Sequence, residues 1–153
     1  MKLTHVDERG RARMVDVGDK PASERTAVAE GTIRMSREAF DMVARQEVAK
    51  GDVVTVAEVA GVMGAKRTGE LIPLCHPLGL DVVKVEAGLD DTLPGVRVRA
   101  TAKVTARTGV EMEALTAVAV ALLTVYDMVK AVDRTMVIGD VRLVSKTKRE
   151  VSP

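Results

Sequence analysis

VRVRATAKVTAR, residues 96 to 107, is the stretch that decides which fold the chain can adopt. Its apolar residues are Val96, Val98, Ala100, Ala102, Val104 and Ala106, and its polar residues include Arg97, Arg99, Thr101, Lys103 and Arg107. Successive side chains of a strand point to opposite faces, so this alternation predicts a strand with one apolar and one polar face. We therefore expect a sheet that is covered by helices on one face only.

Six segments on either side of this strand supply the other elements. We expect strands at Thr26–Met35, Leu80–Ala87 and Val137–Ser145, and helices at Arg37–Val48, from Asp52 or Thr55 to about Arg67, and from about Glu111 to Val132. The order strand, helix, helix, strand, strand, helix, strand is that of the split βαβ plan. The sequence thus predicts an α+β, ferredoxin-like fold, in which an antiparallel four-stranded sheet has its helices on one face.

Two further expectations concern the core and the domain organisation. Val56, Val59, Ala60 and Met63 recur at helical spacing, so we expect them to form the buried stripe of the second helix. The chain of 153 residues is the size of one domain, and we expect residues 1–153 to form a single domain. Residues 1–25 are charged and show no sustained period, which indicates an arm that is flexible or is ordered by a partner.

The composition limits the classes of function. The net charge is +1, and Tyr126 and Phe40 are the only aromatic residues, which argues against a nucleic-acid or membrane-surface partner. The longest apolar run, Ala114 to Tyr126, is shorter than the roughly 20 residues that span a bilayer. Because the N-terminus lacks a signal-like apolar stretch and a single cysteine cannot form an intrachain disulfide, we expect a cytoplasmic protein.

The segment LIPLCHPLG, residues 71 to 79, places the only cysteine, Cys75, next to His76. A zinc site needs three or four ligands, and the only other histidine, His5, is far away in the chain, so we expect no metal site. A Cys–His catalytic pair is awkward, because adjacent side chains of an extended segment point to opposite sides. The pair is interpreted either as part of a structural loop with a buried thiol or as the wall of a binding pocket.

Two lysines near this segment have both a structural and a functional interpretation. Lys66 lies at the end of the second predicted helix, where it either complements the helix dipole or clamps phosphate oxygens. Lys50 directly precedes Gly51 and is either a surface lysine or a cation held at a site. The residues alone leave both alternatives open.

The long predicted helix carries ionisable residues at both ends. Glu111 and Glu113 lie in its first turn, where acids also stabilise a helix through its dipole. Asp127 and Lys130 share a face at the other end, either as a surface ion pair or as an acid and an amine with shifted pKa values beside an apolar stripe. The 16 residues between Glu111 and Asp127 span about 24 Å, too far for one small-molecule site in one chain. We therefore expect an oligomer whose sites combine opposite helix ends from two subunits.

Two motifs together resemble one family. KRTGELIPLCHPLGLD and TGVEMEALTAVAVALLTVYDMVKAVDR are similar to the cyclic pyranopterin monophosphate synthase family, also called molybdenum cofactor biosynthesis protein C. The resemblance extends to Met14–Gly31 and Ile138–Lys146, and so covers nearly the whole chain. Its departures are Gly69, where Ala or Ser is usual, Val129, where Cys is common, and a TKREVSP tail in place of a Gly-Lys-Ser-like one.

The resemblance implies a lyase of molybdenum cofactor biosynthesis. Such an enzyme uses general acid/base catalysis to convert 3′,8-cyclo-7,8-dihydro-GTP into cyclic pyranopterin monophosphate and pyrophosphate. Its substrate is a GTP derivative made by a radical S-adenosylmethionine GTP cyclase, which implies a functional link to that enzyme. The family also implies a ferredoxin-like fold and a homohexamer, a trimer of dimers with sites at the dimer interface. No cofactor is expected, although Mg²⁺ could accompany the triphosphate.

The same resemblance implies roles for individual residues. The implied catalytic residues are Asp127, Lys50 and Lys130, and the implied substrate-binding residues are Leu74, Cys75, His76, Met112, Glu113, Glu111, Arg25, Lys66 and Lys146. Basic side chains would neutralise the charge that develops on departing pyrophosphate, and Glu113 could accept hydrogen bonds from a guanine-like edge. Two rival functions are a non-catalytic ferredoxin-like module that binds a nucleotide or metabolite, and a hydrolase that uses Cys75.

Overall fold

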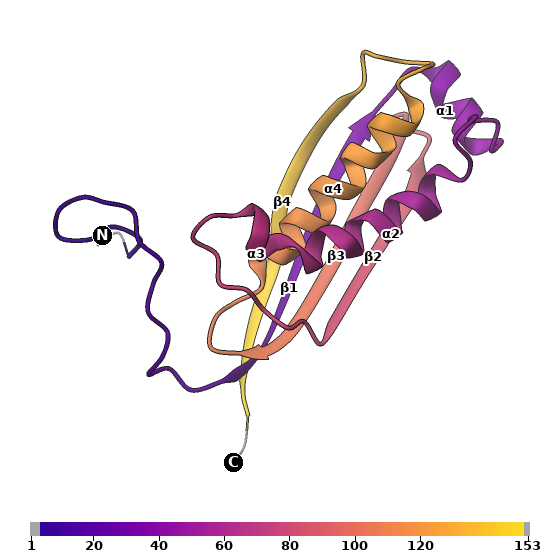
Figure 1. Cartoon of the computed structure of the whole chain (residues 1–153). Coiled ribbons are helices and arrows are strands. Elements are labelled where there is room, and N and C mark those ends of the chain that lie inside the picture. The colour runs from indigo at the N-terminus through magenta and orange to yellow at the C-terminus, as the bar shows by residue number, and fades with distance from the viewer. Residues whose placement is uncertain (1–3, 152–153) are drawn as a thin grey trace.

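The computed structural model of the chain describes residues 4–151 and contains one four-stranded sheet with four helices (Figure 1). The elements in chain order are β1 (Ser23–Arg34), α1 (Arg37–Ala44), α2 (Val53–Lys66), α3 (Thr68–Leu71), β2 (Val82–Asp90), β3 (Gly95–Ala106), α4 (Glu111–Val129) and β4 (Val137–Glu150). The sheet order is β2-β3-β1-β4, and every neighbouring pair is antiparallel. This arrangement confirms the α+β, ferredoxin-like fold expected from the order of strands and helices in the sequence.

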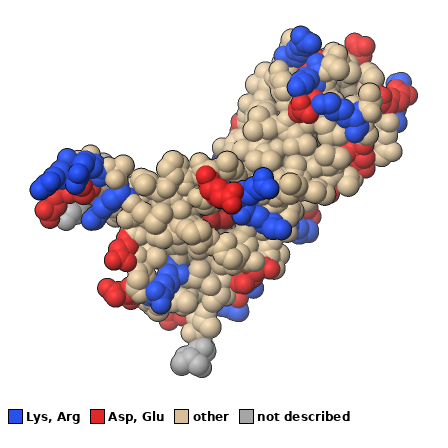
Figure 2. All heavy atoms as spheres, viewed as in Figure 1, with Lys and Arg blue, Asp and Glu red and all other residues tan. Residues whose placement is uncertain are grey.

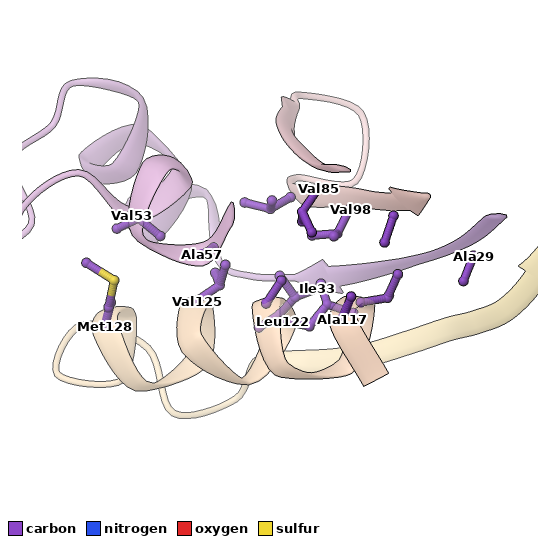
Figure 3. Close-up of a cluster of buried hydrophobic side chains, with 14 of the residues drawn as sticks. Ala29, Ile33, Val53, Ala57, Val85, Val98, Ala117, Leu122, Val125 and Met128 are labelled. Atoms are coloured by element: carbon purple, nitrogen blue, oxygen red, sulfur yellow. The ribbon is translucent and has the colours of Figure 1, made fainter. Parts of the chain in front are cut away.

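The core lies between one face of the sheet and the two long helices, α2 and α4 (Figures 1 and 3). The expected apolar row of β3 is confirmed, because its side chains from residue 96 to 104 on this face are at most 2% exposed. They are paired with the buried row of β1, for example at Ala29↔Ala100 and Ile33↔Val96. Leu122 and Val125 of α4, both fully buried, cover this row.

Helix α4 is the centre of this core. Its 19 residues are long and apolar enough to cross a membrane by length and composition, but they lie against β1, β3, β4 and α2. The sheet approaches the helix closely at Gly31, where a Cβ atom would lie 2.8 Å from Val118 Cγ1 and 2.9 Å from Leu122 Cδ1. The apolar character of α4 is therefore that of a core helix.

The expected buried stripe of α2 was wrong. Val56, Val59 and Met63 are 42%, 56% and 51% exposed, and Ala60 is only partly buried. The buried side of α2 instead consists of Val53, Ala57, Gly61, Gly64 and Ala65. A Cβ at Gly64 would lie 2.8 Å from Val120 of α4, so small residues let the two helices pack closely. The larger apolar side chains of α2 consequently point outward.

Two boundaries differ from expectation in ways that affect the candidate site. Strand β1 begins at Ser23, so Arg25 belongs to the sheet and not to the N-terminal arm. Strand β4 continues to Glu150, five residues beyond the expected end, because it stays paired with β1 as far as Ser23↔Glu150. The short helix α3 follows α2 directly, at residues where no helix was expected.

The N-terminal arm extends away from the sheet (Figure 1). Its described part, residues 4–22, forms a small turn closed by the Val6↔Ala12 bridge. Two contacts fix its base: the Val15 carbonyl oxygen lies 2.7 Å from His76 Nε2, and the Gly18 carbonyl accepts a 2.7 Å hydrogen bond from Arg107 Nη1. Residues 1–3 lie outside the described part, and ordering of the arm by a partner stays a prediction.

Candidate active site

The last turn of α4 places a carboxylate between two lysines. Asp127 Oδ1 lies 2.7 Å from Lys130 Nζ, one turn further along the chain. Its Oδ2 accepts a 2.6 Å hydrogen bond from Lys50 Nζ, which also donates to the Asp127 carbonyl oxygen at 3.1 Å. Lys50 comes from the turn before α2, where Gly51 adopts a φ of +99°. All three side chains are about half exposed, so a ligand can reach them.

The two lysines keep this carboxylate ionised. Hydrogen bonds from Lys130 and then Lys50 lower the pKa of Asp127 to about 2. A carboxylate with so low a pKa is a weak base while both lysines bind it. Proton transfer through Asp127 at neutral pH would therefore require a ligand to displace one of the two ammonium groups from this carboxylate.

The first turn of α4 carries a second cluster, around Glu113. This carboxyl is 2% exposed; Cys75 Sγ donates to its Oε1 at 3.8 Å, and its Oε2 has no hydrogen-bond partner among the described residues. Burial raises the pKa of Glu113, and burial together with the charge of Glu113 raises the pKa of the Cys75 thiol. A thiol with a raised pKa is a poor nucleophile, so Cys75 fits the wall of a pocket better than a covalent catalyst.

The loop after α3 places three expected binding residues near this cluster. Leu74, Cys75 and His76 are all partly buried, and His76 contacts the arm through Val15. The carbonyl of Val15 accepts, so Nε2 of His76 carries the hydrogen in this contact. The imidazole thus joins residues 74–76, called here the LCH segment, to the base of the arm.

A cavity of about 290 Å³ opens beside the first turn of α4. It is lined by Arg25, Thr26, Gly109, Glu111, Lys146, Thr147 and Lys148. Glu111 Oε1 lies 3.1 Å from Lys146 Nζ, and Arg25 Nε donates a 2.7 Å hydrogen bond to Ser23 Oγ. Sequence analysis had not selected Lys148, although it lies two residues after Lys146 on the same strand and therefore shares its face.

No hydrogen bond or ion pair among residues 4–151 joins the side chains of two expected binding residues, Lys66 and Met112, to these clusters. Lys66, the last residue of α2, is exposed, and no carboxylate of residues 4–151 lies within 4.0 Å of it. Met112 is 37% exposed, on the outward side of the first turn of α4. A larger cavity of about 790 Å³, on the sheet face away from the helices, contains none of the expected residues.

The Asp127 cluster and the Glu113 cluster remain separate within one chain. They occupy opposite ends of α4, and the 14-residue separation of Glu113 and Asp127 corresponds to about 21 Å at 1.5 Å per residue. Figure 2 shows charged side chains gathered in separate groups, with a broad uncharged surface over the helices between them. In the described chain, residues 4–151, no group of three or more His, Cys, Asp or Glu residues could hold a metal ion.

Comparison with known proteins identifies the family. A model of the MoaC family matches residues 14–149. The chain belongs to the MoaC family. A relative from Brucella canis is 57% identical over 149 residues, which are 97% of this chain and 90% of the relative. One from Brucella ovis is 58% identical over 146 residues, which are 95% and 88% of the two chains. Both MoaC relatives are named cyclic pyranopterin monophosphate synthase.

Proposed function

We propose that this MoaC-family chain is a cyclic pyranopterin monophosphate synthase, a lyase of molybdenum cofactor biosynthesis. It converts 3′,8-cyclo-7,8-dihydro-GTP into cyclic pyranopterin monophosphate and releases pyrophosphate. The observation that carries this proposal is the Lys50–Asp127–Lys130 cluster, because the rearrangement needs several proton transfers between neighbouring groups. The names of the Brucella relatives support the same reaction.

The proposed roles follow from the chemistry of each cluster. Asp127, Lys50 and Lys130 transfer protons during ring opening and ring closure. Arg25 and Lys146 bind the phosphates and neutralise the charge of the leaving pyrophosphate. The first turn of α4 and the LCH segment bind the base, and Lys66 contributes a further cation. No resident metal takes part, although Mg²⁺ could enter with the triphosphate.

The direct test of this function measures both products of the purified protein. With 3′,8-cyclo-7,8-dihydro-GTP as substrate, we expect one pyrophosphate to be released for each pterin formed. A non-catalytic binding module would bind the compound and release none. The substrate is proposed to come from a radical S-adenosylmethionine enzyme, and the reaction to take place in the cytoplasm.

The active site is proposed to form between two subunits. The helical face, defined here as Val56, Val59, Met63 and Leu123, presents four apolar side chains that are 42–59% exposed. Large exposed apolar patches are typical of protein interfaces. A two-fold axis that lies in this face perpendicular to α4 would run the α4 helices of two copies antiparallel, so that the Glu113 end of each meets the Asp127 end of the other. We propose such dimers, three of which form a hexamer.

Charge placed in the helical face should dissociate the dimer and strongly reduce its activity. Leu123→Asp puts a carboxylate at a position that is 59% exposed in the single chain and buried in the proposed dimer. We expect a smaller species by light scattering after size exclusion and a loss of activity of about tenfold or more, although Leu123 lies outside the proposed chemistry. Val82→Asp, at a valine of the edge strand β2 that is 50% exposed, is the control. Dissociation by Val82→Asp and not by Leu123→Asp would contradict the helical interface.

A further inference from the structure

Lys148 lies where two strands bring basic side chains together. It stands directly opposite Arg25 in the β1–β4 ladder, and Lys146 stands opposite Ala27 in the same ladder. Residues two apart on a strand share a face, and Ala27 is buried on the helix side of the sheet. Arg25, Lys146 and Lys148 therefore occupy the helix-side face, just beyond the first turn of α4, where all three line the 290 Å³ cavity.

Within residues 4–151, the charges on this face are not balanced. Among the described residues that line the cavity, Glu111 is the only one with a carboxylate, and it binds Lys146 at 3.1 Å. No carboxylate of residues 4–151 lies within 4.0 Å of the charged groups of Arg25 or Lys148. On the other face of the same strands, by contrast, Glu24 binds both Lys103 at 3.0 Å and Arg149 at 3.5 Å. The described residues that line the cavity thus carry a surplus of two positive charges, three cations against one carboxylate.

This clustering of positive charge destabilises the protein when no anion is bound in the cavity. Like charges directly opposite each other on neighbouring strands are destabilising, and Arg25 and Lys148 are such a pair. An anion in the cavity would remove this repulsion. The first turn of α4, which has no side-chain cap, adds backbone N–H groups at the same end. At about 290 Å³ the cavity is just below the range of about 300–1,000 Å³ found for drug-sized ligands, so it suits a part of a nucleotide.

We propose that Lys148 acts with Arg25 and Lys146 to bind the triphosphate of the substrate and the pyrophosphate that leaves from it. This rests on the proposed function for the identity of the substrate. Lysine suits the role because its ammonium group is a point charge that can follow a phosphate chain as the leaving group departs. Lys148 is a binding residue in this proposal, and the proton transfers belong to the Asp127 cluster.

The test compares Lys148→Ala, Lys148→Arg and the control Lys84→Ala. Lys84 is an exposed lysine of β2 that binds Glu86, and it lies outside the proposed site. Pyrophosphate without Mg²⁺ is the probe, titrated calorimetrically and used as an inhibitor of turnover. We expect Lys148→Ala to weaken pyrophosphate binding about tenfold and to raise KM with little change in kcat, as loss of one charge-assisted hydrogen bond predicts. Lys148→Arg should keep most of the binding, and Lys84→Ala should equal the unmodified protein.

Thermal unfolding separates a binding role from a structural one. Without ligand, Lys148→Ala should melt at the same temperature as the unmodified protein or slightly higher, because it removes a like-charge pair. With pyrophosphate, its gain in Tm should be smaller than that of the unmodified protein. A lower Tm without ligand, together with an unchanged pyrophosphate affinity, would overturn the inference.

The outcomes also separate this inference from the proposed function. If the protein releases pyrophosphate from the substrate but Lys148→Ala changes neither KM nor inhibition by pyrophosphate, the inference about Lys148 fails and the function stands. If the protein does not turn over the substrate but binds pyrophosphate in a Lys148-dependent way, the proposed function fails. The polyphosphate site then stands by itself.

Discussion

Co-assembly of Glu113→Gln with Asp127→Asn is expected to restore an activity that neither variant has alone. In a two-fold dimer, each proposed site takes Glu113 from one subunit and Asp127 from the other. A mixed dimer therefore has one site with both substitutions and one site with neither. Random mixing makes half of the dimers mixed, so about a quarter of the sites should be intact.

The experiment uses two affinity tags so that mixed oligomers are purified from co-expressed chains. The matched control combines Asp127→Asn with Lys130→Ala, which lie at the same end of α4. That pair leaves every site with at least one substitution and should stay inactive. Equal activity of both combinations, or no activity in either, would contradict sites that combine opposite helix ends.

Loss of either partner in the Lys50–Asp127 contact should reduce turnover strongly. Removing a positioned acid/base group typically lowers the rate by about 10²–10⁴-fold, and we expect a fall of this size for Lys50→Ala and for Asp127→Ala. The measurement is single-turnover formation of the pterin product, which separates chemistry from product release. Asp41→Asn is the control, since Asp41 is another solvent-accessible carboxylate near a cation, Arg37. Near-normal turnover by either alanine variant would remove these residues from the mechanism.

The pH dependence gives an independent check on the same cluster. The pKa of Asp127, about 2, lies below the ordinary value of 3.8. A carboxyl whose pKa is lower in the folded state than in the unfolded state stabilises the fold at every pH above its unfolded-state pKa. For Asp127 this contribution is lost only as the pH falls through 3.8 towards 2. If the reaction rate falls on the acidic side of neutral pH, the group that titrates there is therefore not Asp127 in its contact with Lys50 and Lys130.

Local patterns predicted much of the fold, and the exceptions have a physical cause. The alternation of β3 correctly predicted which of its side chains face the core. The stripe of α2 failed because apolar spacing shows that a helix face avoids water, but not which surface covers it. Gly61 and Gly64 lie on the inner side of α2, where there is too little room for a side chain, and Val59 and Met63 lie on the surface.

The candidate site was predictable to the extent that its contacts are local. The spacing of Asp127 and Lys130 on one helix indicates their ion pair directly. The contact of Lys50 with Asp127 joins residues 77 apart, and it depends on how α2 packs beside α4. Lys148 was missed because its environment exists only once β4 pairs with β1 beyond residue 145. The position of Lys148 opposite Arg25 depends on the register between β1 and β4, which cannot be read from the local sequence.

The closely packed helix that carries both clusters also works as a ruler. Each residue of an α-helix adds about 1.5 Å and turns the chain by about 100°, so one insertion or deletion within α4 would shift and rotate one cluster relative to the other. In a symmetric pair the same error would occur at both sites at once. Substitutions on the surface of α4 can therefore accumulate in evolution, but its length should be held constant.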